Sequence, residues 1–269
     1  MGLTLTLKTT PEVPLEAEVI TPDRMNGLGP EDAARLTVHH GNREAALGDF
    51  FRVGSHDGEE LRLEGDLGRV KLIGAAMTGG KIHVAGDVGL HLGVAMAGGE
   101  IVVEGNAGDW VGPEMTGGRI VIKGDAGHAV GSAYRGSRVG MKGGEIVVHG
   151  AAGNEVGNTQ RNGLIAIGGA CGDFAGVNML AGTIVVLGEM GIRCGAGMKR
   201  GTIVAMGGAE PLPTFTYACR YQPGFLRLYL RHLSTLGLAV APEQVTGLYD
   251  RWSGDSVELN RGELLVHRG

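Results

Sequence analysis

The chain has 269 residues, of which 51 are glycine and 9 are proline, and aromatic residues make up only 4%. Glycine at this frequency, without the Gly-X-Y period of collagen, excludes collagen, coiled coils and helical bundles. The formal net charge of -5 gives no general affinity for nucleic acid or acidic membranes.

The sequence has no run of about 18 apolar residues, so no membrane span is predicted. The first residues lack the basic and apolar segments of a secretory signal. The three cysteines, Cys171, Cys194 and Cys219, are too few and too scattered for a disulfide framework or a metal site. Small buried thiols in a reducing compartment are the interpretation that we favour over a reactive thiol. We therefore expect a cytoplasmic protein.

Residues 1–57 show no repeat and are predicted to form a small α/β cap. The leucines at positions 3, 5 and 7 alternate with threonines, which is typical of a strand, and we expect another strand over Val13–Ile20. Pro30–Leu36 starts with a proline and two acidic residues, a pattern that predicts a short helix. A further strand is expected over Leu36–His39.

Residues 58–207 repeat a unit of 19 residues, and this repeat determines the predicted fold. In one unit the β-branched run Ile101–Glu104 is followed by Gly105, Gly108 and Gly112. Branched residues favour strands, and glycine permits sharp bends where a Cβ would clash with the next turn of chain. The repeat predicts an all-β fold, a right-handed parallel β-helix of about seven coils stacked about 4.8 Å apart.

Three columns of small or unbranched side chains are predicted to fill the interior of the coils. The third column has one methionine per coil, a spacing that indicates core packing rather than a soft-metal site, and it is interrupted once, by Gln160. The columns contain Val88, Ala107, Ala126, Ala152, Cys171 and Met190; Leu92, Val111, Val130, Val156, Ala175 and Cys194; and Met77, Met96, Met115, Met141, Met179 and Met198.

One repeat unit carries an insertion of seven residues, Ala133–Val139. It is expected to bring Arg135 and Arg138 together, with Lys142 close behind. A loop on a regular scaffold is where binding residues tend to lie, so these three cations are candidate contacts for an anionic ligand or an acidic partner surface. The alternative is a solvated loop without a ligand.

Residues 208–269 form a C-terminal extension without the repeat. A helix is predicted to begin near Pro223 and to end at Gly237, with apolar residues at helical spacing. A hairpin is expected to follow, with Val257 and Leu259 facing Leu264 and Val266. In the helix predicted between Pro223 and Gly237, the residues that recur at helical spacing are Phe225, Leu228, Tyr229, His232, Leu233 and Leu236. The helix suits both an end cap and a docking element for another subunit.

The sequence offers no catalytic or metal-ligating constellation. Glu104, Lys123 and His149 share one outward column, but their neighbours in that column are uncharged, which is typical of a solvated face. The nine histidines show neither the HxH nor the HExxH spacing of metal sites. We therefore assign no catalytic residue and no metal.

The repeat resembles a known family, as the unit with Gly105, Gly108, Gly112, Met115 and Gly118 illustrates. It is similar to the C subunit of formylmethanofuran dehydrogenase and to its counterpart in the bacterial formyltransferase/hydrolase complex. The same glycine pattern marks the C-terminal domain of the large subunit of glutamate synthase. The resemblance covers roughly residues 45–207. The helix-bearing C-terminal extension favours the formyltransferase/hydrolase version.

The resemblance implies a complex of methylotrophic one-carbon metabolism that acts in formaldehyde oxidation. Such a complex transfers a formyl group from tetrahydromethanopterin to a methanofuran-type carrier and releases formate. Its hydrolase and formyltransferase chains would be the partners of this chain, which would be a non-catalytic scaffold subunit with no catalytic residue of its own. Arg135 and Arg138 would then contact the anionic carrier.

Two other functions stay open. The chain would serve as the C subunit of a molybdenum or tungsten formylmethanofuran dehydrogenase, or it would act alone as a β-helix enzyme on polysaccharide. Association of two copies through the edge of the coil stack also stays open.

Overall fold

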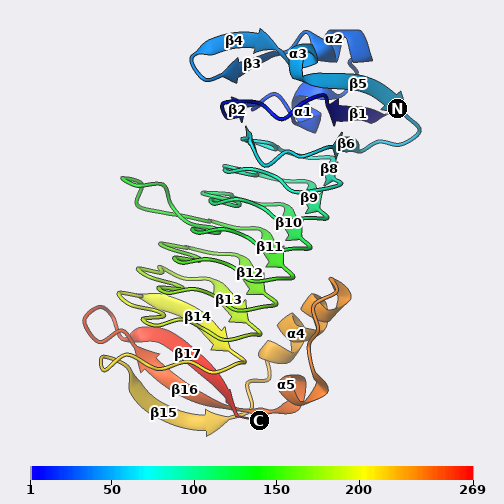
Figure 1. The fold of residues 1–269 in the computed structure, drawn as a ribbon. Coiled ribbons are helices and arrows are strands. Elements are labelled where there is room, and N and C mark those ends of the chain that lie inside the picture. The colour runs from blue at the N-terminus through cyan, green and yellow to red at the C-terminus, as the bar shows by residue number, and fades with distance from the viewer. Residues whose placement is uncertain (1, 269) are drawn as a thin grey trace.

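The computed structural model describes residues 2–268 and consists mainly of β-strands. A 13-stranded, mostly parallel sheet runs along the whole molecule, with the order β15-β16-β17-β14-β13-β12-β11-β10-β9-β8-β6-β1-β5 (Figure 1). A second sheet of four strands lies at the N-terminal end. None of the described helices is both long and apolar enough to cross a membrane.

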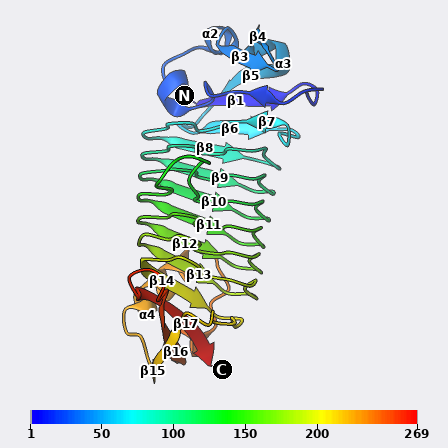
Figure 2. The same ribbon diagram turned by 90° about the vertical axis from the view of Figure 1, so that its left-hand side faces the viewer.

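The middle of the large sheet is built by successive turns of chain, each of which adds one parallel strand (Figure 2). Ile101 lies opposite Ile120, and Ile120 lies opposite Ile146, so equivalent positions of the repeat are stacked in register. The strands predicted from the β-branched runs are confirmed. They are β6 (Leu61–Glu64), β8 (Lys81–Val84), β9 (Glu100–Val103), β10 (Arg119–Ile122), β11 (Glu145–Val148), β12 (Leu164–Ile167), β13 (Thr183–Val186) and β14 (Arg200–Ala205).

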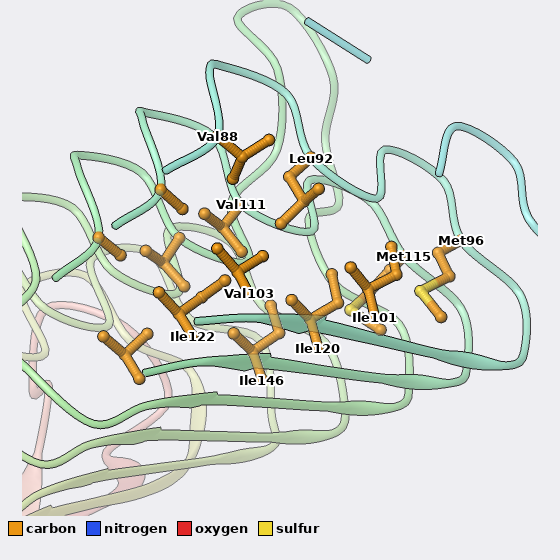
Figure 3. Packing of buried hydrophobic residues seen from close by; sticks show 14 of the residues in the cluster. Val88, Leu92, Met96, Ile101, Val103, Val111, Met115, Ile120, Ile122 and Ile146 are labelled. Atoms are coloured by element: carbon orange, nitrogen blue, oxygen red, sulfur yellow. The ribbon is translucent and has the colours of Figure 1, made fainter. Parts of the chain in front are cut away.

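The interior of the stack contains the three predicted columns. A ladder of single β-bridges runs from Leu67 through Val88 and Ala107 to Met190, so the first column is a second line of parallel pairing. The second column and the methionine column are buried, and they pack against the inward side chains of the strands (Figure 3). Gln160 replaces a methionine in this column but still points into the interior. It is fully buried, and its side-chain amide donates to the carbonyl of Gly163 at 3.0 Å.

The glycines at the corners make close stacking of the turns possible. A Cβ on Gly105 would lie 2.6 Å from the backbone carbon of Gly86 in the preceding turn. Gly112 has a φ of 61°, and a Cβ there would lie 2.6 Å from Cδ1 of Ile146. Both positions need a residue without a side chain, the first because of backbone approach and the second because of conformation and core packing.

The N-terminal cap continues the large sheet. β1 (Gly2–Leu7) pairs antiparallel with β5 (Phe51–His56) and parallel with β6. The smaller sheet has the order β4-β3-β2-β7 and is accompanied by three short helices. Their bounds are β2 (Leu15–Glu16), β3 (Thr37–His40), β4 (Arg43–Ala46), β7 (Val70–Lys71), α1 (Pro22–Met25), α2 (Pro30–Ala34) and α3 (Leu47–Phe50).

Three predictions for the cap are confirmed, including the strand over Leu36–His39, which is β3, and one is wrong. The alternating leucines form β1, and the proline-led helix is α2. The strand expected over Val13–Ile20 comprises only Leu15 and Glu16. The chain leaves the strand direction early because Thr21 caps α1, with its hydroxyl accepting from the amide of Arg24 at 3.3 Å.

The C-terminal extension closes the other end of the stack. Its last strand pairs parallel with β14, and the two strands before it pair antiparallel at the outer edge. Its elements are β15 (Thr216–Tyr221), α4 (Leu226–Thr235), α5 (Pro242–Thr246), β16 (Leu248–Gly254) and β17 (Arg261–Arg268).

The predicted hairpin exists, but its first strand was placed wrongly. Trp252 lies opposite Leu264, whereas Val257 belongs to the connecting turn and is 73% exposed. The side chain of Asp255 fixes this turn, because it accepts from the amides of Val257 at 3.1 Å and Gly197 at 2.9 Å. A local side-chain hydrogen bond therefore overrides the apolar alternation.

The predicted helix in the extension is confirmed as α4, which covers the outer face of β11 to β14. Its buried side chains are Leu226, Leu230 and Leu233, which pack with Val147 and Val185 of the sheet. The expected apolar face was partly wrong, since Phe225 and Leu228 are exposed. Relative to the predicted apolar face, the helix is rotated about its axis, so that Leu226, Leu230 and Leu233 pack against the sheet.

Candidate functional site

The inserted loop projects from the stack between β10 and β11 (Figure 1). Arg135, Arg138 and Lys142 are all exposed there, and none of the three forms an ion pair within residues 2–268. Arg135 lines a groove beneath the loop, whereas Arg138 and Lys142 do not. The structure therefore separates the three predicted contacts into one groove residue and two residues outside it.

Tyr134 holds the inserted loop against the body of the protein. Its hydroxyl lies 2.8 Å from Nδ1 of His91, and its ring is stacked on Trp110 with centroids 4.9 Å apart and planes 29° apart. Its amide donates to Oε1 of Glu114 at 3.2 Å. We call the side chains of His91, Trp110 and Tyr134 the aromatic clasp.

The pKa shifts of His91 and Tyr134 favour the neutral form of both groups in the clasp. Burial lowers the pKa of His91 and raises the pKa of Tyr134 to about 12. A neutral imidazole and a neutral phenol are therefore favoured, and the tautomer of His91 decides which of the two groups donates the hydrogen bond. The inserted loop is thus held by a specific contact rather than extended freely into solvent.

At one corner of each turn, a residue other than glycine has the left-handed backbone conformation. The φ angles are 62° at His91, 63° at Trp110, 61° at Ala129 and 61° at Glu155. Residues other than glycine seldom adopt this region. These positions form a single outward column, in which Trp110 and Glu155 are two turns apart, about 10 Å by strand spacing. Between them the column has only the methyl group of Ala129, which is buried.

This gap in the column forms a groove of about 530 Å³. Its lining includes two aromatic residues, Trp110 and Tyr134, and two acidic residues, Asp109 and Glu155. Arg135 is the one arginine or lysine in this lining. The full lining is Asp109, Trp110, His128, Ala129, Ala133, Tyr134, Arg135, Gly136, Ser137, Asn154, Glu155, Asn158 and Thr159.

Polar side chains beside the groove form a ladder of hydrogen bonds from turn to turn. Oδ1 of Asp109 accepts from the amide of His128 at 2.7 Å, and Nδ1 of His128 accepts from the amide of Asn154 at 2.9 Å. Oδ1 of Asn154 accepts from the amide of Asp173 at 2.9 Å. Each side chain thereby keeps its second polar atom for another partner: Oδ2 of Asp109, Nε2 of His128 and Nδ2 of Asn154.

This ladder was not predicted from the sequence, although a signal for it was present. Asp109, His128, Asn154 and Asp173 each follow the second glycine of their unit directly. A parallel ladder follows the first glycine, where Oδ1 of Asp87 accepts from the amide of Asn106 at 2.6 Å. The repeated Gly-Asp and Gly-Asn pairs indicate side chains that cap the backbone of the next turn.

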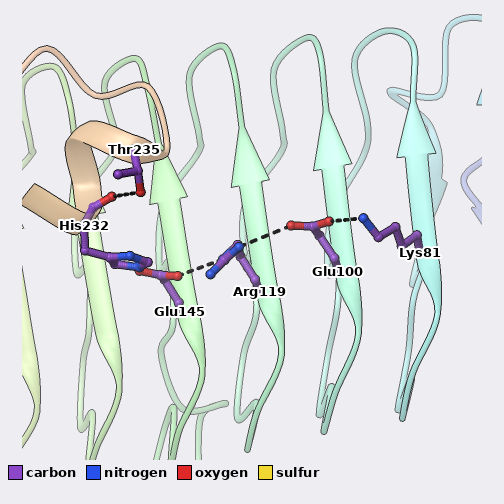
Figure 4. Close-up of polar contacts among 6 residues, drawn as sticks. All are labelled: Lys81, Glu100, Arg119, Glu145, His232 and Thr235. Atoms are coloured by element: carbon purple, nitrogen blue, oxygen red, sulfur yellow. Dashed lines mark hydrogen bonds and ion pairs between the residues drawn. The ribbon is translucent and has the colours of Figure 1, made fainter.

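A row of alternating charges crosses the outer face of the sheet (Figure 4). Lys81 contacts Glu100 at 3.0 Å, Arg119 contacts Glu100 at 3.5 Å and Glu145 at 2.8 Å, and His232 of α4 contacts Glu145 at 2.7 Å. The row joins β8, β9, β10 and β11 to the helix. Its charges are satisfied by one another, so we assign it to positioning α4.

The predicted outward column also pairs within the protein. Nε2 of His83 lies 3.1 Å from Glu104, and Nζ of Lys123 lies 3.4 Å from Nε2 of His149. Burial lowers the pKa of His149. These contacts fit the predicted solvated face, in which charged groups pair without forming an acid and base around a substrate.

Two cysteines lie in the core, as predicted. Burial raises the pKa of Cys171 to about 12 and that of Cys194 to about 11, so their thiols stay protonated at neutral pH. Cys219 differs, since it is exposed on β15. Among residues 2–268, no three His, Cys, Asp or Glu side chains gather as a metal site would require.

Comparison with known proteins gives consistent matches to one kind of subunit. No family model matches the chain. A crystal structure of the formyltransferase/hydrolase complex from Methylorubrum extorquens with methylofuran contains a chain 39% identical in sequence, with a TM-score of 0.91. That match covers 99% of this chain and 100% of the other.

Curated relatives match over shorter stretches. The C subunit of the Methylorubrum extorquens formyltransferase/hydrolase complex is 39% identical over 89 residues, 32% of this chain and 34% of the relative. The C subunit of molybdenum-containing formylmethanofuran dehydrogenase 1 from Methanothermobacter marburgensis is 47% identical over 94 residues, 34% of this chain and 24% of the relative. The matched stretch thus spans about a quarter to a third of these relatives.

Proposed function

The chain belongs to the family of C subunits of formyltransferase/hydrolase and formylmethanofuran dehydrogenase complexes, and from that premise we propose that it is a non-catalytic structural subunit of a formyltransferase/hydrolase complex. The observation that carries the proposal is the match along the full length of a chain from such a complex. The complex would transfer a formyl group from tetrahydromethanopterin to a methanofuran-type carrier and release formate.

The proposed role is mechanical. Backbone pairing in register, the side-chain ladders and the charge row all join one turn to the next, so the stack is expected to be stiff along its length. A stiff scaffold holds the hydrolase and formyltransferase chains at a fixed separation. The formylated carrier would then pass between two active sites without escaping into solution.

The proposal includes a specific architecture. We take the stack to be a right-handed parallel β-helix of about seven coils, divided into a cap at 1–57, coils at 58–207 and an extension at 208–269. The 19-residue register between Ile101 and Ile120 and the second bridge ladder support a tube of stacked coils. A cytoplasmic location fits the three free cysteines.

The inserted loop is the proposed contact of this protein with an anionic group. Arg138 and Lys142 face solvent outside the groove, and Arg135 reaches its rim. Their cations are free of ion pairs within the described chain, so they remain available for a carboxylate on the carrier or on a partner subunit.

Co-purification tests the proposed function. The tagged chain, expressed with the hydrolase and formyltransferase chains, should retain both on an affinity column, and the assembly should release formate from formyl-tetrahydromethanopterin. A matched variant with Arg135→Glu and Arg138→Glu should fold normally and should lose partner retention or formyl transfer. A chain that elutes alone as a monomer under all conditions would show that it is no scaffold subunit.

A second candidate keeps the same scaffold role in a different complex. Identity to the C subunit of a molybdenum-containing dehydrogenase reaches 47% over the matched stretch, which favours a dehydrogenase assembly. Metal analysis of the co-purified complex decides between the two. Molybdenum or tungsten together with reduction of an electron acceptor identifies the dehydrogenase, whereas formate release without either metal identifies the formyltransferase/hydrolase.

A further inference from the structure

The groove beneath the inserted loop lies where the left-handed column has a small side chain. In the outward left-handed column, Ala129 stands directly between Trp110 and Glu155, and the groove opens at this position. Ala129 is buried, and the inserted loop, whose Tyr134 contacts His91 and Trp110, contributes residues 133–137 to the lining of the groove.

Further along the left-handed column, an arginine side chain lies against an aromatic ring of the neighbouring turn. Phe174 and Arg193 occupy it at φ angles of 63° and 60°, one turn apart. The guanidinium carbon of Arg193 lies 5.5 Å from the centroid of the Phe174 ring. Trp110 and Ala129 are the equivalent pair at the groove. Ala129 has a methyl group where Arg193 has a guanidinium group, and Tyr134 of the inserted loop already stacks on the Trp110 ring.

Asp109, Glu155 and Arg135 are the carboxylates and the guanidinium group among the lining residues, so acidic groups outnumber strongly basic ones there. The carboxylates of Asp109 and Glu155 line the groove, each with one oxygen already engaged: Oδ1 of Asp109 with the amide of His128, and Oε2 of Glu155 with Asn158 at 2.9 Å. Their second oxygens have no partner in the described residues. Two carboxylates beside aromatic rings form a typical environment for a guanidinium group.

We propose that this groove binds an arginine side chain on the surface of another subunit, with the guanidinium group beside Trp110 and between the carboxylates of Asp109 and Glu155. The proposal builds on the proposed function, because it takes partner chains to exist. The groove would bind a positive group of the partner, and the exposed cations Arg138 and Lys142 nearby would bind a negative group of the same partner.

The two tryptophans of the chain provide a direct readout. In the 15N-labelled full-length protein each gives one indole N–H signal in the NMR spectrum, and Trp252→Phe assigns them. We expect the peptide acetyl-Gly-Arg-Gly-amide to shift the Trp110 signal in a saturable manner and to leave the Trp252 signal unchanged. The matched peptide with citrulline, which is nearly isosteric but neutral, should cause no saturable shift.

Two variants link the response to the groove. Asp109→Asn together with Glu155→Gln keeps the shapes and should weaken binding of the arginine peptide about tenfold. Ala129→Arg places a guanidinium in the gap from within and should abolish binding. The backbone at this position permits an arginine, because Arg193 has the same conformation further along the same column. An unchanged Trp252 signal verifies folding of both variants.

Three results would overturn the proposal: no shift with the arginine peptide, equal shifts with arginine and citrulline, or a saturable shift with acetyl-Gly-Glu-Gly-amide that depends on Arg135. The last result would assign the groove to an anionic ligand instead. Because the titration uses the isolated chain, its outcome is independent of co-purification. A complex that assembles normally while the peptide does not bind would reject this site and leave the scaffold role intact.

Discussion

Gly112 illustrates how a single position governs the stacking of the turns. Its φ is 61°, and a Cβ there would meet Cδ1 of Ile146 at 2.6 Å. Gly112→Ala is expected to lower the free energy of unfolding by about 1 to 3 kcal/mol, through backbone strain and overpacking of the core. Urea denaturation followed by circular dichroism measures this change.

Gly79→Ala provides the matched control, since a Cβ at Gly79 would lie more than 4 Å from any described atom outside its chain neighbours. It should leave stability within about 0.5 kcal/mol or raise it slightly. Equal losses in the two variants would show that the corner glycine is dispensable.

Asp250 is the residue whose charge state should set acid stability. It accepts from Arg220 at 2.7 Å and from Arg268 at 2.7 Å, and these hydrogen bonds lower its pKa from 3.8 to about 2. A lowered folded-state pKa means that the unfolded chain binds the proton more readily, so the stabilisation is present above pH 3.8 and is lost as the pH falls towards 2.

Asp250→Asn checks this dependence. The difference in unfolding free energy between the parent chain and the variant should be largest near neutral pH and should shrink between pH 4 and pH 2, about the window given by the two pKa values. Urea denaturation at several pH values measures it. A difference that stays constant down to the acidic limit would contradict the ion-pair interpretation.

At the scale of elements, α4 depends on its buried leucines. Leu230 is fully buried against the sheet, whereas Leu228 on the same helix is 72% exposed. Leu230→Ala should destabilise the protein by about 2 to 5 kcal/mol, while Leu228→Ala should change stability by no more than about 0.5 kcal/mol. Thermal or urea unfolding of the two variants side by side tests the orientation of the helix, and the reverse order would mean that the other face is docked.

The inserted loop is the second element whose behaviour can be predicted. Burial lowers the pKa of His91 from 6.5, so the folded protein favours the neutral ring, which is hydrogen-bonded to Tyr134. The clasp should therefore be intact above pH 6.5 and should open as the pH falls through the lowered pKa of His91. Fluorescence of Trp110 in the Trp252→Phe background should change in that range.

Tyr134→Phe is the control for the clasp. It keeps the ring that stacks on Trp110 but removes the hydroxyl group, so the acid-induced fluorescence change should disappear. If the change persisted with the same midpoint, the charge on His91, whose ring lies 6.3 Å from that of Trp110, would act on the fluorescence directly and not through opening of the clasp. The loop would then be held by stacking alone.

At the scale of the whole molecule, the fold is a stack closed at both ends by strands from outside the repeat. β1 adds to the first turn and β17 adds to the last, so neither end of the repeat presents an unpaired strand. Edges remain at β5 and β15, and a register irregularity between Tyr217 and Cys219 interrupts the exposed β15. An irregular edge discourages pairing with a second copy.

The sequence by itself determined the stacked part of the protein. In a repeat of 19 residues every turn meets a copy of itself, so the position of a residue within the unit fixes both its neighbour and its direction. For that reason Val88, Leu92 and Met96 could be placed in the core from spacing alone. The insertion Ala133–Val139 could be recognised for the same reason, because it interrupts the regular spacing of the repeat.

Only the tertiary structure decided where non-repeating segments turn and what they contact. Val257 lies in a turn because Asp255 binds local amides, and α4 faces the sheet with Leu230 rather than Leu228 because the sheet offers an apolar surface there. The groove joins Asp109, Tyr134 and Glu155 from three turns of the chain. Such contacts depend on how loops fold back in space, which periodicity does not encode. The sequence therefore predicted the insertion and Arg135, but not the residues of other turns that meet them in the groove.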